Sequence, residues 1–277
     1  MSAGAPEPFD AGWLALREPV DHASRAGGLE EELVRHLLTR PTGGARDARV
    51  RVVDLGAGTG STLRHLAPRL ARLGLAAPQD WTLVDHDDRL LSRALAAPRP
   101  PAAATVRTRR ADLGDAAALA DVLAGADVVT ASALLDVLTP ATAATLVGAL
   151  AAVVPRAAVL VALTVTGGAG PRPADARARE VAAAFDADQR AHGLGPDATA
   201  HVTALLEPVW RVRAAASPWR LGPAHGELLD AWWRGWTAPA LRAAGPGGDL
   251  AAWAHARRTD PALRAEVPHR DLLALPV

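Results

Sequence analysis

Five residue types are missing from the 277-residue sequence: cysteine, lysine, asparagine, isoleucine and tyrosine. Without cysteine, the protein has no disulfide framework, no thiolate ligand for a metal and no cysteine nucleophile. Without lysine, it cannot form the Gly-Lys-Ser/Thr phosphate loop of nucleoside triphosphatases. Alanine, arginine, leucine, glycine and proline are abundant instead, a bias typical of a high-G+C genome. An Ala-rich or Arg-rich stretch of this chain therefore carries less information than it would elsewhere.

Net charge and long apolar runs are lacking too. The 30 basic and 30 acidic residues cancel, so the chain has no broad positive field, and no nucleic-acid partner is predicted. No stretch reaches the roughly 18 uncharged apolar residues of a spanning helix, and the first residues, MSAGAPEPFDAGW, are unlike a secretory leader. No membrane partner is expected, and a cytoplasmic protein is predicted.

Apolar runs that end in acids or small polar residues alternate with stretches of helical period, a pattern that predicts a parallel sheet covered by helices on both faces. Residues 61–73 place Leu63, Leu66, Leu70 and Leu73 on one helix face. The chain is long enough for one large α/β domain with an added subdomain. The predicted strands cover residues 50–55, 80–85, 105–112, 126–132 and 156–165, with a further helix over 140–154.

The flanking segments are mainly helical in pattern. One or two helices are expected within residues 9–40, with a turn at Gly27 and Gly28, and a loop is expected over residues 39–48. After the fifth strand, helices are predicted over 174–192 and 224–236, and strands over 209–219 and 267–277.

The segment VVDLGAGTG spaces three glycines two apart behind an acid, Asp54. A glycine-rich turn at the carboxyl end of a parallel strand lets backbone N–H groups and a helix N-terminus approach a ligand. A dinucleotide fingerprint would need glycine at position 61, which is Ser61, and it would start from an apolar residue rather than an acid. A carboxylate at this point favours a ligand that carries positive charge and no phosphate.

The same segment resembles the first motif of the class I S-adenosylmethionine-dependent methyltransferases, an acid followed by G-x-G-x-G after the first strand. Residues from about 50 to 165 follow the order of that family's motifs. The resemblance implies a three-layer, Rossmann-like α/β fold with a seven-stranded sheet whose last strand is antiparallel, and S-adenosyl-L-methionine as the cofactor. The residues of this segment that it assigns to the cofactor are Asp54, Gly56, Ala57, Gly58 and Gly60.

Three later features match the family's remaining motifs. Asp85 closes the second strand about 25 residues after the last glycine, where the family's acid accepts hydrogen bonds from the ribose hydroxyls, and His86 follows it. Asp112, after the third strand, corresponds to the contact with the adenine amino group, with Leu113 packed on the ring. Ser132, at the end of the fourth strand, corresponds to a position near the methionine portion of the cofactor.

Three residues are candidates for catalysis. Asp136 follows the fourth strand on the side where the resemblance places the substrate; it could accept a proton or orient a hydroxyl or amine, or simply be an acid on a helical turn. His22 and His192 lie in segments that cover the substrate in this family, and each is either a proton acceptor or an ordinary histidine of the surface or core. Positioning alone can supply most of the acceleration of methyl transfer.

The nine histidines show no metal-ligand spacing, so no catalytic metal is predicted.

Tryptophans and arginines offer further candidates. The tryptophans that gather late in the chain would pack a helical cap, form an aromatic wall for a planar acceptor, or make a homodimer contact. Arg17, Arg190 and Arg220 are candidates to clamp an acceptor carboxylate or phosphate. The late tryptophans are Trp210, Trp219, Trp232, Trp233, Trp236 and Trp253.

These observations predict a methyltransferase that acts on an oxygen or nitrogen atom of a small-molecule metabolite. The cofactor-binding core spans residues 46–170, behind an N-terminal helical segment, 1–45. Residues 171–277 supply substrate-covering helices, as a C-terminal cap, and the last strands of the same sheet. Segments such as WLALREP and SPWRLGP resemble an uncharacterised group of actinobacterial methyltransferases.

Two other functions stay open. A methyltransferase-like binding or regulatory subunit without activity would keep the cofactor pocket but have a sealed acceptor cavity or a heteromeric tryptophan interface. The second is an NAD-dependent oxidoreductase, and Ser61 and the acid at position 54 are evidence against it.

Two narrower methyltransferase classes are disfavoured. Base-amine methyltransferases of the superfamily carry an Asn/Asp-Pro-Pro-aromatic motif that this chain lacks, and the cytosine carbon-5 enzymes use a cysteine nucleophile, which is absent here.

Overall fold

The computed structural model describes residues 10–39, 49–245 and 248–277. The loop predicted over residues 39–48 therefore lies, apart from Thr39, outside the described residues.

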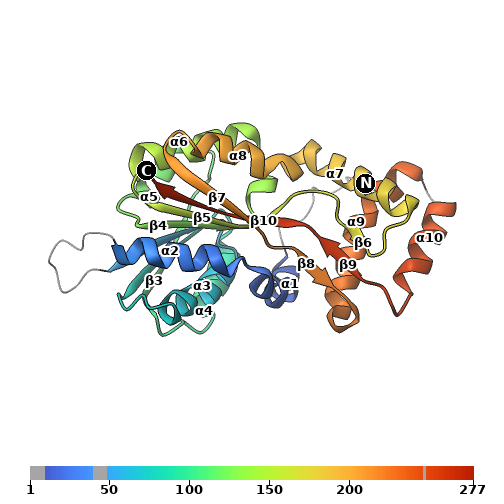
Figure 1. The fold of residues 1–277 in the computed structure, drawn as a ribbon, viewed down its shortest axis with the longest axis horizontal. Coiled ribbons are helices and arrows are strands. Elements are labelled where there is room, and N and C mark those ends of the chain that lie inside the picture. The colour runs from blue at the N-terminus through green and yellow to red at the C-terminus, as the bar shows by residue number, and fades with distance from the viewer. Residues whose placement is uncertain (1–9, 40–48, 246–247) are drawn as a thin grey trace.

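A seven-stranded sheet forms the centre of the molecule (Figure 1). Its strand order reverses between β1 and β4, because β2 and β3 extend on one side of β1 while β4 and β5 extend on the other. The last strand, β10, runs antiparallel to both β5 and β7, and the first five strands are parallel to one another. This confirms the predicted sheet and its antiparallel last strand. In order across the sheet, the strands are β3 (Ala103–Arg110), β2 (Gln79–Asp85), β1 (Val50–Leu55), β4 (Val128–Ser132), β5 (Ala158–Val165), β10 (His269–Pro276) and β7 (Trp210–Ala216).

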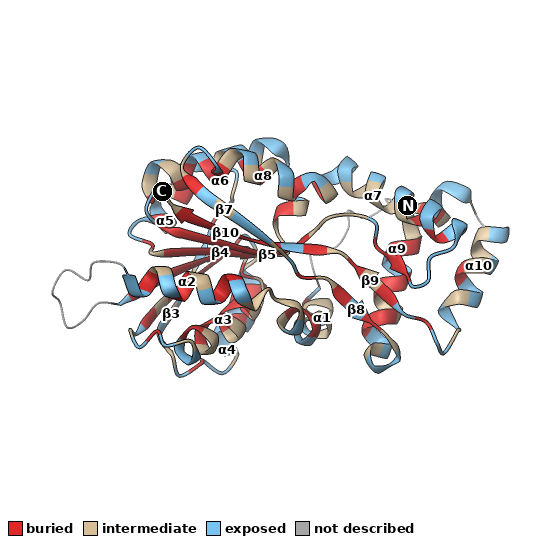
Figure 2. Cartoon of the chain, viewed as in Figure 1, coloured by how far each residue is buried: buried red, intermediate tan, exposed pale blue. Residues whose placement is uncertain are grey.

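Helices cover both faces of the sheet, as predicted. One face carries α2 (Gly27–Thr39), α3 (Ser61–Arg72) and α4 (Asp88–Ala96), and the other carries α5 (Ala116–Leu123), α6 (Pro140–Val153) and α8 (Ala198–Leu206) (Figure 1). Leu63, Leu66 and Leu70 of α3 are buried against the sheet, as their spacing predicts. The central strands are buried along nearly their whole length, which accounts for their unbroken apolar runs (Figure 2).

The N-terminal helices break earlier than the sequence predicts. Helix α1 covers Ala11–Ser24, and Gly27 already begins α2, so the turn lies at Arg25 and Ala26 rather than at the glycines. The extended backbone of Arg25 and a hydrogen bond from Ala26 N to the buried Asp271 carboxylate, 2.8 Å long, turn the chain at this point. A contact with a residue 245 positions away fixes this boundary, so glycine content alone could not predict it.

A cap lies beyond the edge of the sheet at which β5 ends and β10 begins (Figure 1). Its strands β6 (Gly170–Pro171), β9 (Ala265–Val267) and β8 (Trp219–Leu221) form a small antiparallel sheet that the sequence analysis did not predict. Pro218 lacks a backbone N–H, and the strand predicted over 209–219 is divided near it into β7 and β8. The cap helices are α7 (Ala176–His192), α9 (Gly226–Ala244) and α10 (Asp249–Arg258).

The tryptophans of α9 form the core of this cap. Trp232 and Trp236 stack with ring centroids 5.3 Å apart, and Trp233 packs against both. They fill the cap as packing residues, which was the first of the three interpretations above.

Across the three described ranges, no helix has the length and apolarity needed to cross a membrane.

Candidate functional site

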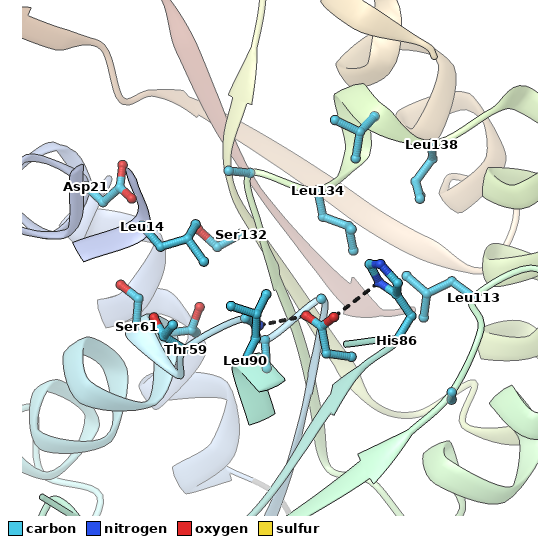
Figure 3. Close-up of a pocket in the computed structure, with 18 of the residues that line it drawn as sticks. Leu14, Asp21, Thr59, Ser61, His86, Leu90, Leu113, Ser132, Leu134 and Leu138 are labelled. Atoms are coloured by element: carbon cyan, nitrogen blue, oxygen red, sulfur yellow. Dashed lines mark hydrogen bonds and ion pairs between the residues drawn. The ribbon is translucent and has the colours of Figure 1, made fainter. Parts of the chain in front are cut away.

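A cavity of about 370 Å³ opens at the carboxyl ends of β1, β2 and β4, next to the point where the strand order reverses. In open α/β sheets this position is where ligands bind. The cavity walls come from the turn after β1, the turns after β2, β3 and β4, and one face of α1 (Figure 3). Its size is that of an ordinary small-molecule site.

Most residues that the motifs assign to the cofactor meet in this cavity. Asp54 and Gly60 are the two of that set that do not line it. The eight that line it are Gly56, Ala57, Gly58, Asp85, His86, Asp112, Leu113 and Ser132.

The turn after β1, residues 56–60, is called the glycine turn here, and it leaves room that side chains would fill. Gly56 and Gly58 have φ angles of +62° and +54°, in the left-handed region that glycine adopts without strain. A Cβ on Gly56 would lie 2.8 Å from Cδ1 of Leu134, and a Cβ on Gly58 would lie 3.3 Å from Cδ1 of Leu14. Gly60 is the N-cap residue of α3, and a Cβ on it would lie 3.2 Å from Cβ of Ala94 in α4, so its small size serves the packing of these two helices.

Asp85 joins the turns after β1 and β2. Its Oδ2 accepts a hydrogen bond from Gly58 N at 2.8 Å, and its Oδ1 accepts one from Asp87 N at 3.0 Å. His86 Nδ1 lies 3.2 Å from the same Oδ1, while the imidazole itself is largely exposed. Each carboxylate oxygen retains lone-pair capacity for a further donor, so Asp85 can receive the hydroxyls of a ligand.

The turn after β3 forms the opposite wall. Asp112 is exposed, lines the cavity and accepts a hydrogen bond from Gly114 N at 2.8 Å. Asp115, not Asp112, caps α5, with its carboxylate accepting from Ala117 N and Ala118 N. The helix-capping role that a short acidic loop can have therefore belongs to Asp115, and Asp112 is left beside Leu113 in the wall.

Asp54 lies beneath the cavity rather than in its wall. It is fully buried, its Oδ1 accepts a 2.7 Å hydrogen bond from Thr130 Oγ1, and no described residue is bonded to its Oδ2. Burial raises the pKa of Asp54 to about 7, although the hydrogen bond from Thr130 opposes that shift. A cationic ligand above the glycine turn would favour the ionised form.

The three catalytic candidates lie outside the cavity wall. Asp136 sits on the 3₁₀ turn η1 (Leu135–Val137); its Oδ1 has no partner among the described residues, and burial raises its pKa. His22 Nε2 lies 3.0 Å from Ser61 Oγ, behind a residue that does line the cavity. His192 is exposed at the end of α7, and its Nδ1 lies 2.7 Å from the Asp188 carbonyl. Of the three, Asp136 is flanked by residues of the wall, Leu134, Val137 and Leu138.

One face of α1 contributes residues that were not predicted as part of a cofactor site. Leu14, Arg17 and Asp21 follow the spacing i, i+3, i+7, which places them on one side of the helix, and all three line the cavity. Figure 3 shows Leu14 and Asp21 on the opposite side of the cavity from His86 and Leu113. The spacing was visible in the sequence, but nothing local indicated which face of α1 meets the glycine turn.

The turn after β4 adds an apolar wall. Ala133 follows Ser132 with a φ of +49°, an uncommon conformation for a residue with a Cβ, and Leu134 then turns towards Gly56. Leu90 of α4 and Thr59 of the glycine turn complete the lining near Asp85. Within the described ranges, no tryptophan lines the cavity and no cluster of three or more His, Asp or Glu side chains could hold a metal ion.

Comparisons with known proteins agree with this architecture. No protein-family model and no curated protein sequence matches the chain. Among solved structures, loganic acid methyltransferase with SAH superposes over 99% of both chains with a TM-score of 0.50 at 9% identity. The chain has a methyltransferase fold.

Two further methyltransferase structures are similar at lower scores. The plantazolicin methyltransferase BpumL in complex with SAH is 12% identical, covers 96% of this chain and 91% of its own, and has a TM-score of 0.44. The magnesium protoporphyrin IX methyltransferase ChlM from Synechocystis PCC 6803 with bound SAH is 15% identical, with 77% and 84% covered and a TM-score of 0.41. The similarity to loganic acid methyltransferase concerns the fold alone, and the chemistry of the site depends on its own residues.

Proposed function

We propose that this protein transfers a methyl group from S-adenosyl-L-methionine to an oxygen or nitrogen atom of a small-molecule metabolite. The observation that carries the proposal is the meeting of the glycine turn, Asp85, Asp112 and Ser132 in one cavity at the carboxyl ends of the strands. These residues come from four separate turns, spread over 77 positions of the sequence from Gly56 to Ser132.

The chemistry of the cavity fits this cofactor. Gly56 and Gly58 leave a cradle that Cβ atoms would narrow, and Asp85 offers acceptor oxygens to a pair of ribose hydroxyls. Asp112 and Leu113 together offer an acceptor and an apolar surface, which suits the amino group and ring of adenine. The buried Asp54 below the turn favours a ligand with positive charge over a pyrophosphate, which supports a sulfonium cofactor against a nicotinamide dinucleotide.

In this mechanism, the main task of the chain is to position the cofactor and the acceptor. S-adenosylmethionine supplies a methyl group that its sulfonium has already activated. The residues of this chain hold the nucleoside at Asp85 and Asp112, keep water away with Leu14 and Leu134, and present the acceptor beside Ser132 and Ala133. An in-line approach of the acceptor atom supplies most of the rate gain, so no strong base is required. Asp136, close behind this wall, is the residue that we propose to orient the acceptor or take its proton.

Calorimetric titration with S-adenosylhomocysteine tests the cofactor. We expect binding by the wild type, no binding of NADH, and at least a tenfold loss of affinity in Asp85→Asn, because the amide replaces one acceptor oxygen by a donor. Asp80→Asn is the matched control: Asp80 lies at the opposite end of the same strand, bonded to Arg49 and Thr105, and its substitution should leave the affinity unchanged. A folded wild type that does not bind S-adenosylhomocysteine would overturn the proposal.

Methyl transfer is tested separately. Tritium from methyl-labelled S-adenosylmethionine should appear in a small-molecule acceptor when the protein is incubated with fractionated metabolite extract, and Gly56→Ala should abolish the transfer by filling the cradle. Gly74→Ala is the control, since Gly74 also has a positive φ, +103°, but its Cβ would meet nothing within 4 Å. Cofactor binding without transfer to any acceptor would favour the non-catalytic subunit instead.

A further inference from the structure

Arg17 is set apart by its place and by the way it is held. It is the only arginine among the described residues that line the cavity, and the chain has no lysine. Arg190 is paired with Asp197 on the surface, and Arg220 is exposed on β8, so neither of the other two arginine candidates reaches the cavity. The cavity therefore has one fixed cation, supplied by α1.

The guanidinium of Arg17 is fixed on two sides. Its Nε and Nη2 donate to the two oxygens of Asp21 at 2.8 and 3.2 Å, and its Cζ lies over the ring of Trp219, 4.9 Å from the centroid. Trp219 Nε1 in turn donates to Asp21 Oδ1 at 3.0 Å, which closes a three-residue network. The Arg17 side chain is only 11% exposed, so the surrounding residues restrict the orientation of its guanidinium.

One edge of the guanidinium is left without a partner. No hydrogen bond runs from Nη1 to any described residue, although Arg17 lies beside the cavity. A guanidinium has five N–H donors in a rigid fork that matches a carboxylate. With Nε and one Nη2 hydrogen committed to Asp21, the remaining donors are available to a ligand, and no ordering of the side chain is needed before binding.

We propose that Arg17 is a carboxylate-binding residue of this cavity, held in its binding orientation by Asp21 and Trp219. The proposal deepens the proposed function and rests on it, because it concerns a ligand of the same cavity. A carboxylate can come from two sources here: the amino-acid end of the cofactor, or an acidic acceptor. The chemistry is shared, and the two sources are separable by experiment.

The first arm of the test concerns the cofactor. S-adenosylhomocysteine and its decarboxylated analogue are titrated into the wild type, Arg17→Gln and the surface control Arg190→Gln. If the cofactor supplies the carboxylate, the wild type and Arg190→Gln should prefer S-adenosylhomocysteine at least tenfold, and Arg17→Gln should bind the two compounds equally.

The second arm concerns the acceptor. Benzoate and benzamide are titrated into the same proteins with and without saturating S-adenosylhomocysteine. If the acceptor supplies the carboxylate, wild type and Arg190→Gln should bind benzoate at least tenfold more tightly than benzamide, and Arg17→Gln should lose that preference. Should Arg17→Gln fail to fold, Arg17→Lys keeps the charge without the fork, and it should reduce the preference rather than abolish it.

The outcomes separate this inference from the function on which it rests. The proposed role of Arg17 is overturned if the wild type binds S-adenosylhomocysteine but shows no carboxylate preference in either arm, or if Arg17→Gln retains the preference. Either result leaves the assignment of the cofactor unchanged. A wild type that binds no S-adenosylhomocysteine overturns the proposed function, while the benzoate arm still decides the role of Arg17.

Discussion

Asp54 differs from the other acids of the site in having no access to solvent, and its Oδ2 has no partner among the described residues. Burial raises its pKa from 3.8 to about 7, so the folded protein holds this proton over a range in which the unfolded chain has released it. The contribution of Asp54 to stability is therefore fully present below pH 3.8 and is lost as the pH rises through about 7. An asparagine, which does not ionise and can still accept from Thr130, removes that dependence.

We expect Asp54→Asn to gain stability relative to the wild type by about 1 kcal/mol per pH unit between pH 4.5 and 6.5, and to level off above 7. Urea unfolding of both proteins across this range measures the difference, in which contributions from the histidines cancel. Asp80→Asn should give a flat difference there, because hydrogen bonds from Thr105 and Arg49 lower the pKa of Asp80 and its transition lies at more acid pH. Parallel curves for Asp54→Asn and wild type would mean that Asp54 is ionised throughout.

Residues of the site were predictable where the signal was local. The glycine turn, Asp85 and Asp112 follow strands at spacings that the α/β unit sets, and all of them reach the cavity, apart from Gly60. Their contacts with the cofactor stay predictions. Leu14 and Arg17 could not be predicted as cofactor-site residues from local sequence. Their position depends on how α1 packs across the glycine turn, and contacts of α1 with residues tens or hundreds of positions away fix that packing.

At the scale of elements, α1 forms one wall of the cavity and is fastened to α3. Glu18 of α1 forms an ion pair with Arg64, and His22 Nε2 lies 3.0 Å from Ser61 Oγ. Burial, together with the neighbouring His65 ring 4.9 Å away, lowers the pKa of His22 below 6.5, although Glu18 opposes the shift. Stability from this group is therefore present above pH 6.5 and is lost as the pH falls through the folded-state pKa.

We expect acidification from pH 7.5 to 5.5 to loosen α1 selectively, because protonated His22 would face His65 and Arg25. Hydrogen exchange, corrected for the intrinsic pH dependence, should show several-fold faster opening of amides in residues 11–24 but not in α5, which has no histidine. His22→Gln should remove the effect, since glutamine can still bond to Ser61 and does not titrate. An equal response in the variant would assign the loosening to another group.

At the scale of the whole molecule, the sheet was predictable and much of the cap was not. The apolar runs of the parallel strands β1, β2, β4 and β5 give a strong signal, whereas β6 and β9 have two and three residues and carry no usable period. The last strands, β7 and β10, return to the sheet from the C-terminal part of the chain, after the cap has begun. A homodimer, a cytoplasmic location and an actinobacterial source stay predictions.

Asp271 joins these distant parts. Its Oδ2 accepts from Ala26 N at the start of α2, and its Oδ1 accepts from Leu163 N in β5 and Ser217 Oγ between β7 and β8. It stands at the irregularity between Arg270 and Leu272 in β10 and is 2% exposed. One carboxylate therefore links the N-terminal helices, the central sheet and the entry to the cap.

We expect Asp271→Ala to lower the free energy of unfolding by about 3 to 5 kcal/mol, because a buried backbone N–H group, a partly buried one and a buried hydroxyl lose their acceptor. Asp115→Ala is the control: Asp115 also accepts from two amides, but in an exposed helix cap, so its loss should cost about 1 kcal/mol. Urea unfolding followed by tryptophan fluorescence, dominated by the cap, and by circular dichroism, dominated by the whole fold, should shift together in Asp271→Ala. A shift in fluorescence alone would mean that the cap unfolds independently and that Asp271 does not couple it to the sheet.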